Sequence, residues 1–265
     1  MNNYAHASPS HASREGGQGV GPGTRIAMWS GPRNISTAML RAWGNRPDTW
    51  VVDEPLYAHY LTQISVGHPG VEEVIAHHEN DWRKVVDRIT GPVPEGRAIY
   101  YQKHMAHHWL PHLQGDWLLK LRNAFLIRHP AEMLPSLTAK MGPPQLADTG
   151  LPQQVALLRF IRERTGTTPP VLDSEDILRD PRAALARFCD VVGVPFLEQM
   201  LSWPPGRRET DGVWAKYWYD AVEKSTGFEP YRPRERTVPA ELRPLLAACL
   251  PYYEELRSHR VWSSE

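Results

Sequence analysis

The sequence lacks a surplus of charge of either sign. Its 265 residues include 30 basic and 30 acidic side chains, so the formal net charge at pH 7 is zero. Proteins that coat nucleic acid or bind an anionic membrane usually carry a basic surplus, so we expect neither partner. A neutral total still permits a local basic pocket, which is where the search for a site begins.

Cysteine, lysine and long apolar runs are also scarce. The two cysteines, Cys189 and Cys249, lie in apolar helical surroundings and are expected to be buried and reduced, although the sequence leaves a disulfide open. No signal segment and no run of ~18 apolar residues is present, so we expect a cytoplasmic protein. Six lysines against 24 arginines is a bias typical of GC-rich bacterial coding sequences.

Five short apolar runs are predicted to be strands, with helical stretches between them. Such alternation is expected of a parallel sheet covered on both faces, and short continuous apolar runs suit strands buried on both sides. We therefore predict an α/β fold of three layers, αβα, with a central parallel sheet of about five strands and a helical C-terminal part. The predicted strands are 26–29, 50–52, 99–102, 124–127 and 171–172.

The remaining organisation follows from composition and capping signals. Gly, Ser, His and Pro dominate residues 1–23, which we expect to be disordered, leaving a single domain over 24–265. The longest helix is predicted over 71–90. Another is predicted to begin with Asp180 as its N-cap and Pro181 at its first position.

An anion-binding loop is predicted after the first strand, in RIAMWSGPRNISTAMLRAW at residues 25–43. A strand–loop–helix turn directs free backbone N–H groups and the positive helix end at one point, which suits phosphate or sulfate. Arg33 adds a cation, and Ser36 and Thr37 add hydroxyls. The Gly-Lys-Ser/Thr ending of a Walker A loop is missing, and an ordinary β–α turn remains the alternative.

This loop resembles that of the PAPS-dependent sulfotransferase family, PAPS being 3′-phosphoadenosine 5′-phosphosulfate. Bacterial members carry a loop similar to G-x-P-R-S-G-T-T. Ile35 departs from this pattern, because a glycine is usual there and a β-branched residue disfavours positive φ. The resemblance implies a P-loop NTPase-like fold and a PAPS donor contacted by Gly31, Arg33, Asn34, Ile35, Ser36 and Thr37.

A second segment that resembles the family is NAFLIRHPAEMLPS, residues 123–136. A strand is predicted to end at Arg128, and the helix that begins at Pro130 carries Ser136, eight positions after the arginine. In the family, a similar strand–Arg–x–Pro–helix segment holds the 3′-phosphate of the donor with an Arg and a Ser at this spacing. The resemblance implies the same role for Arg128 and Ser136; the alternative is a surface arginine and a solvated serine.

Two later segments extend the resemblance to about residue 228. Residues 170–196 are similar to a late strand–helix segment of the family, in which we expect caps and turns rather than catalysis. Nearer the C-terminus, the family has a basic, glycine-containing loop that closes over the 3′-phosphate and adenine. The usual R-K-G-x-x-G-D-W pattern is absent, and the corresponding residues are Lys224, Ser225, Thr226 and Gly227. Aromatic residues over 214–219 could wall an acceptor pocket or belong to the core.

Two residues are candidates for the base that takes the acceptor's proton. His104, after Lys103, partly resembles the Lys-x-His-Leu segment of cytosolic sulfotransferases, whose histidine is the base. Glu54 has a spacing similar to the P-D-x-x-x-x-E-E segment of tyrosylprotein sulfotransferases, whose second glutamate is the base. Both remain open. Lys103 is the expected cation on the bridging oxygen, with Arg33 as a second cation.

Four neighbouring histidines raise a metal site as an alternative. They lack an HExxH motif and an obvious carboxylate partner, and arginine, lysine and backbone N–H groups can supply the positive charge, so no metal is expected. These histidines are His104, His107, His108 and His112.

The function implied by the resemblance is in-line, metal-independent transfer of a sulfuryl group from PAPS to a hydroxyl or amine. A P-loop kinase or nucleotide hydrolase is the second possibility, and a non-catalytic nucleotide-binding protein on the same fold is the third. The acceptor is open among small molecules, peptides and sugars, and so is the oligomeric state. Zero net charge argues against long anionic polysaccharides, which usually need a basic groove.

Overall fold

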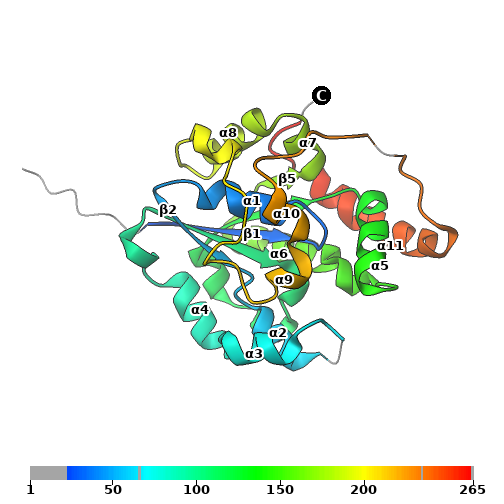
Figure 1. The fold of residues 1–265 in the computed structure, drawn as a ribbon, viewed down its shortest axis with the longest axis horizontal. Helices are drawn as coiled ribbons and strands as arrows, with labels where there is room; N and C mark the ends of the chain where they lie inside the picture. Colours follow the sequence, from blue (N-terminus) through cyan, green and yellow to red (C-terminus); the bar gives the residue numbers. More distant parts are fainter. Residues whose placement is uncertain (1–22, 65–66, 234, 264–265) are drawn as a thin grey trace, which may run out of the picture.

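A five-stranded parallel sheet forms the centre of the computed structural model, which describes residues 23–64, 67–233 and 235–263 (Figure 1). The order of the strands across the sheet is β2-β3-β1-β4-β5, and every pair is parallel. Each predicted strand is confirmed and is one to three residues longer than expected. The strands are β1 Thr24–Ser30, β2 Thr49–Asp53, β3 Ile99–Met105, β4 Arg122–Ile127 and β5 Val171–Asp173.

Helices cover both faces of the sheet, because successive side chains of a strand point to opposite sides. In β1, Ile26 and Met28 are buried in one apolar cluster, while Ala27 and Trp29 are buried in another. The first cluster is covered by α1 (Ser36–Gly44), α7 (Ser174–Arg179) and α8 (Pro181–Val191). The second is covered by α4 (Trp82–Thr90), α5 (Pro130–Met141), α6 (Leu151–Thr165) and α11 (Arg243–Arg257). The predicted three-layer arrangement is therefore confirmed.

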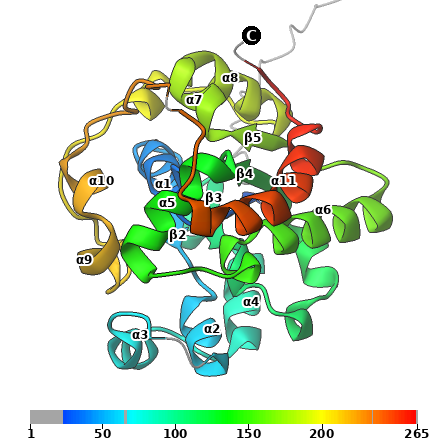
Figure 2. The ribbon, with the colours of Figure 1, turned by 90° about the vertical axis from the view of Figure 1, so that its right-hand side faces the viewer.

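The other helices are short and lie around the sheet. Helices α2 (Tyr57–Gln63) and α3 (Val71–His77) lie beside α4 at the lower side of the molecule in Figures 1 and 2, opposite α7 and α8. After β5 the described chain is helical or irregular, as predicted, and includes α9 (Ala215–Trp218) and α10 (Asp220–Lys224). Single turns of 3-10 helix are η1 Pro94–Gly96, η2 Ala106–His108, η3 Pro111–Leu113, η4 Asp116–Lys120, η5 Leu146–Thr149, η6 Glu198–Leu201 and η7 Ala240–Leu242.

The prediction of one long helix over 71–90 is wrong. The chain is extended at His78, with φ −124° and ψ 150°, and a new helix begins at Trp82. The side chain of Asp81 accepts a hydrogen bond from the backbone N–H of Arg83, so it caps the second helix. The N-cap signal at Asp81 outweighed the helical periodicity. Asp180 caps α8 in the same way, through the N–H of Ala183, as predicted.

Two further expectations concern cysteines and termini. Cys189 and Cys249 are buried as predicted, and they are free rather than paired. Residues 1–22, nearly all of the segment expected to be disordered, lie outside the described residues. Among the described residues, no helix combines the length and apolar character that a bilayer span requires.

Candidate active site

A cavity of about 110 Å³ opens at the carboxyl ends of the central strands. From β1 the chain passes to β2 and β3 on one side of the sheet and to β4 and β5 on the other. Crevices at such a reversal of strand order are the usual ligand sites of open α/β sheets. The lining residues are Pro32, Arg33, Asn34, Ser36, Thr37, Glu54, Tyr57, His68, Lys103, Met105, His107, His108, Leu137, Met141, Trp218 and Tyr219.

The loop after β1 takes its left-handed residue at Arg33, with φ 57°, and not at Ile35. Ile35 has φ −88° and ψ 25°, and its side chain packs against the apolar cluster under α1. A β-branched residue is therefore free of strain there. Gly31 is needed for a different reason: a Cβ at Gly31 would lie 2.5 Å from the carbonyl oxygen of Thr149. Gly31 thus allows close packing and is not among the residues that line the cavity.

The first turn of α1 faces the cavity without a side-chain cap. The N-cap residue is Ile35, whose apolar side chain cannot accept a hydrogen bond. The first N–H groups of α1 therefore have no side-chain acceptor at the N-cap. Ser36 and Thr37 of that turn line the cavity. Asn34 donates from its amide to the carbonyl oxygen of Leu126 at 2.9 Å, which ties the loop to the end of β4. The loop therefore presents an uncapped helix N-terminus, which suits an anion.

The loop contacts the second predicted phosphate-binding segment, which carries Arg128 and Ser136. Nε of Arg33 donates to Oγ of Ser136 at 2.9 Å, and a terminal nitrogen of Arg128 donates to the carbonyl oxygen of Arg33 at 2.9 Å. Glu132 lies 3.3 Å from Arg128. Arg33 has no ion-pair partner among the described residues, and burial together with the charge of Arg128 lowers its pKa. Two close cations, of which only Arg128 has a carboxylate partner, suit an anion site.

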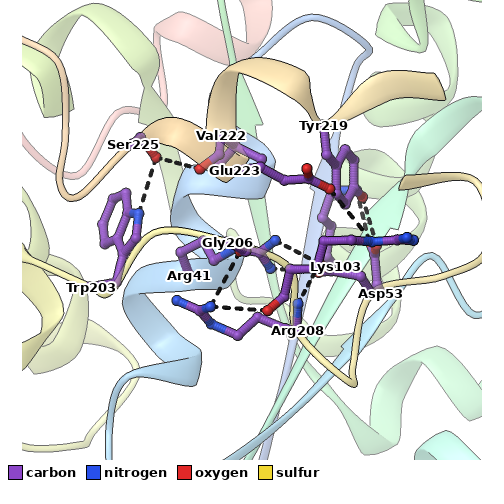
Figure 3. A network of polar contacts seen from close by, with 12 residues as sticks. Arg41, Asp53, Lys103, Trp203, Gly206, Arg208, Tyr219, Val222, Glu223 and Ser225 are labelled. Carbon is purple, nitrogen blue, oxygen red and sulfur yellow. Dashed lines mark hydrogen bonds and ion pairs between the residues drawn. The ribbon is translucent and has the colours of Figure 1, made fainter. Parts of the chain in front are cut away.

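On the other side of the cavity, a buried polar network surrounds Lys103 (Figure 3). Its Nζ donates to Asp53 Oδ1 at 2.8 Å, to Glu54 Oε1 at 2.5 Å and to Tyr219 Oη at 2.9 Å. The hydroxyl of Tyr219 in turn donates to Asp53 Oδ2 at 2.6 Å. Asp53 and Lys103 are register partners in the pairing of β2 with β3, so the sheet itself places them together.

Glu54 follows β2 in a left-handed conformation, with φ 40°. A positive φ is uncommon for residues other than glycine and tends to persist where the surroundings enforce it, often at functional sites. Here the N–H of Glu54 donates to the carbonyl oxygen of Lys103 at 2.8 Å. Burial raises the pKa of Glu54, and the charge of Lys103 opposes that rise. The carboxyl group is therefore a candidate base with a pKa moved toward neutrality.

His104, the other candidate base, lies on the opposite face of the sheet from Lys103. Its ring stacks on Trp29, its register partner in β1, with centroids 4.2 Å apart. Its Nε2 hydrogen-bonds with Oε1 of Gln102, and the residue is 1% exposed. It does not line the cavity, because strand β3 continues through both residues and alternates their side chains. Burial lowers the pKa of His104 to about 3, so its ring is neutral at pH 7.

Histidines of the following turn do reach the cavity, and sequence reasoning had considered them only as metal ligands. His107 and His108 line it, and Nδ1 of His108 lies 3.9 Å from Oε2 of Glu54. The ring of His108 stacks on Tyr57 with centroids 4.7 Å apart. Burial lowers the pKa of His107 to about 3 and that of His108 well below its usual range. Among the described residues, no group of three or more His, Cys, Asp or Glu side chains is arranged to hold a metal ion.

The segment over 203–225 closes one side of the cavity with Trp218 and Tyr219, two of the aromatics considered as acceptor walls. It is fastened to α1 by Arg41, which forms two hydrogen bonds of 2.5 and 2.7 Å with Asp211. Trp214, by contrast, is buried in the core. The sequence alone gave no indication that Trp218 and Tyr219 would line the cavity while Trp214 would be buried in the core.

The four residues expected to close over the donor lie elsewhere. Lys224 is exposed, and Ser225 accepts a hydrogen bond from the indole N–H of Trp203 at 3.1 Å (Figure 3). The carbonyl oxygen of Thr226 accepts from the N–H of Trp203, and Gly227 pairs with Ser202. None of the four lines the cavity, because these contacts hold them against the 202–203 segment.

Comparison with known proteins agrees with this geometry. The family model described as Sulfotransferase domain matches residues 24–260. Two relatives from Arabidopsis thaliana, named branched-chain-amino-acid aminotransferase-like proteins 2 and 1, are 36% and 38% identical over 236 and 241 residues. These matches cover 88% and 90% of this chain but 41% and 42% of the relatives, so the chain spans less than half of their length. Bacterial origin stays a prediction.

A solved structure has the same fold. The sulfotransferase from Alicyclobacillus acidocaldarius is 14% identical, with a TM-score of 0.52, and the match covers 89% of this chain and 96% of that one. The family match extends over nearly all of the described residues and includes both arginine segments and Glu54. The chain therefore belongs to the sulfotransferase family and is an enzyme of that class.

Proposed function

We propose that this sulfotransferase takes its sulfuryl group from PAPS and transfers it to a hydroxyl or amine of an acceptor bound beside Glu54. The observation that carries the proposal is the single cavity that joins the uncapped loop of residues 31–37 to the Glu54 carboxyl group. A transferase needs both an anion site and a base within reach of one reacting atom, and this cavity is lined by both.

PAPS fits the donor side because that side offers two positions for anions. The N-terminus of α1 and Arg33 suit the 5′-phosphosulfate. Arg128 and Ser136 suit the 3′-phosphate, which ATP lacks. Arg33 connects the two positions, since it hydrogen-bonds with both Ser136 and Arg128. Arg128 and Ser136 do not line the cavity themselves but contact Arg33, which does. Lys224 to Gly227 are left out of the proposed donor site, because their contacts are with residues 202–203 instead.

The proposed reaction is an in-line displacement at sulfur that requires no metal. The acceptor oxygen forms a bond to sulfur, and the bond between sulfur and the bridging phosphate oxygen breaks. The acceptor's proton passes to Glu54, and the bond's electron pair leaves on the 5′-phosphate of 3′-phosphoadenosine 5′-phosphate (PAP). Arg33 and the N–H groups of α1 stabilise the charge that develops on the leaving oxygen.

We propose a small molecule or sugar as the acceptor. The acceptor side is walled by Tyr57, Trp218 and Met141, and its two inner imidazoles, His107 and His108, are neutral. Such walls suit an uncharged or weakly polar compound better than a polyanion. Location in the cytoplasm, and a single domain over residues 24–265, stay predictions that accompany this proposal.

The donor is tested by titrating the protein with PAP and, separately, with ADP and Mg²⁺. We expect PAP to bind in the micromolar range and ADP to bind much more weakly. A micromolar ligand at millimolar concentration stabilises the fold by about 4 kcal/mol, which a thermal shift detects. Clear preference for ADP with Mg²⁺ would contradict the proposed donor, and binding of neither ligand would refute it. Release of PAP from PAPS in the presence of a panel of phenols, alcohols and amines then tests the transfer.

A further inference from the structure

All three N–H groups of the Lys103 ammonium are used in hydrogen bonds to the protein. An ammonium group has three N–H bonds, and its Nζ lies within 2.9 Å of three protein oxygens, on Asp53, Glu54 and Tyr219. Its side chain is 2% exposed. Lys103 therefore borders the cavity while every one of its hydrogen bonds is made to the protein.

The partners of Lys103 are themselves held in place. Asp53 uses both oxygens, one for Lys103 and one for the hydroxyl of Tyr219. The ring of Tyr219 lies near the ammonium group, with Nζ 5.3 Å from its centroid. Asp53, Lys103 and Tyr219 thus form a closed set of hydrogen bonds, in which each member contacts the other two (Figure 3).

Glu54 differs from these partners because one of its oxygens is left over. Oε1 accepts from Lys103, whereas Oε2 accepts no hydrogen bond from the described residues. Nδ1 of His108 lies 3.9 Å from Oε2, beyond hydrogen-bonding distance. The side chain is 12% exposed and lines the cavity, so this oxygen is free to take a proton from a bound acceptor.

We propose that Lys103 is a positioning residue for Glu54 and does not bind the sulfuryl donor, and that Asp53 and Tyr219 hold it in that role. This inference rests on the proposed function, because Glu54 acts as a base only if transfer takes place here. It replaces the expectation that Lys103 stabilises the bridging oxygen. Arg33 is left as the side-chain cation on the bridging oxygen of the donor, in keeping with its lack of a carboxylate partner among the described residues.

The proposal has a consequence for the dependence of activity on pH. The charge of Lys103 opposes the rise in the pKa of Glu54 that burial causes. Without that charge, Glu54 binds its proton more tightly and becomes an active base only at higher pH. The charged and titratable groups that face Glu54 from the surrounding elements are Arg33, Asp53, Tyr57, His68, Lys103, His107, His108 and Tyr219.

The test compares Lys103→Met with the wild-type enzyme, using the best acceptor of the panel. We expect the acidic limb of the kcat/KM profile to move to higher pH by a unit or more, with a loss of about tenfold for each unit at pH values on that limb. Activity should return as the pH is raised, and Kd for PAP should stay within about threefold. Lys216→Met is the matched control, since Lys216 is exposed, pairs with Glu73 and does not line the cavity.

The opposite pattern would overturn the proposal. If Lys103→Met weakens PAP as much as Arg33→Ala does, and its acidic limb does not move, Lys103 acts on the donor. Should Lys103→Met fail to fold, Tyr219→Phe also distinguishes positioning of Glu54 from binding of the donor. Tyr217→Phe is its control. We expect Tyr219→Phe to lower kcat about tenfold with KM for PAPS unchanged, and a selective rise in that KM would contradict the role. Failure of the wild-type protein to bind PAP would instead refute the proposed function.

Discussion

The two sides of the cavity treat their cations differently. On the donor side, Arg33 hydrogen-bonds with a serine hydroxyl and has no carboxylate partner among the described residues, and its pKa is lowered. On the acceptor side, Lys103 is surrounded by three oxygen acceptors, two of them carboxylates, and its pKa is raised well above the usual value. Both cations border the same cavity.

This difference indicates which cation awaits a ligand. A buried charge is stable only when it is paired and hydrogen-bonded, so a saturated cation is part of the protein's own structure. A cation short of acceptors is at its most stable when an anion arrives from outside. The number of acceptors around each cation thus separates Arg33, which we propose binds the donor, from Lys103, which we propose positions the base.

The largest expected effect is that of Glu54→Gln. The amide cannot take the acceptor's proton, so kcat should fall by about 10²- to 10⁴-fold, while Kd for PAP is unchanged. Steady-state kinetics and calorimetry measure the two quantities.

His104→Gln is the matching variant for the other base candidate. Because His104 lies beneath the sheet and away from the cavity, we expect its kcat to stay within a few fold of wild type. Loss of activity in His104→Gln with activity kept in Glu54→Gln would reverse the assignment.

Loss of an unsaturated cation should weaken the donor. Hydrogen bonds to charged groups contribute about 1.5–3 kcal/mol, so Arg33→Ala should raise Kd for PAP by about 10- to 100-fold. Arg128→Ala should do the same, through the 3′-phosphate and through the loop carbonyl that Arg128 holds. Calorimetric titration measures both, and unchanged affinity in either variant would remove that arginine from the donor site.

Acidification should destabilise the fold around the C-terminal end of β3 and the turn that follows it. His104 and His107 have pKa values of about 3 in the folded protein, and the pKa of His108 is also well below its usual range. The unfolded chain binds a proton at each near pH 6.5. Below that pH, the unfolded state therefore binds more protons and the free energy of unfolding falls, by about 1.4 kcal/mol per pH unit for each histidine.

Two buried carboxyl groups act in the opposite direction. The pKa of Asp173 is raised to about 6 and that of Glu54 is also raised, so in the folded state both bind protons at a pH where the unfolded chain does not. Three histidines outnumber two carboxyl groups, and we expect Tm to fall between pH 7 and pH 4.5. Calorimetry of wild type and His104→Gln checks this, and an equally steep decline in the variant would exclude His104 as a contributor.

The smallest effect is expected for a cation that is saturated but exposed. Arg159 pairs with Glu255 at 2.6 Å, and its side chain is 61% exposed. Exposed ion pairs contribute little, so Arg159→Ala should leave both Tm and Kd for PAP nearly unchanged. Arg159→Ala serves as the control for Arg33→Ala. A clear loss of PAP binding in Arg159→Ala would show that the loss in Arg33→Ala is not specific to the donor site.

Local patterns predicted the sheet well, and they also placed the two segments of the proposed donor side. Each strand was a short apolar run. Arg128 and Ser136 belong to one strand–helix segment, so their spacing in the sequence could be compared directly with that of the family. The base was harder to predict. The strand was expected to end at Gln102, but it continues through Met105, and that extension places Lys103 and His104 on opposite faces.

What the sequence by itself determined is the order of strands and helices along the chain, the loop after the first strand and the two segments that carry Arg33 and Arg128. These depend on residues close together in the chain, where apolar periodicity and capping act. Only the tertiary structure decided the acceptor side. Tyr219 contacts Asp53 across 166 positions, and Lys103 joins them from a third element. Whether a cation is saturated or free depends on such distant acceptors, so sequence spacing could not distinguish Lys103 from Arg33.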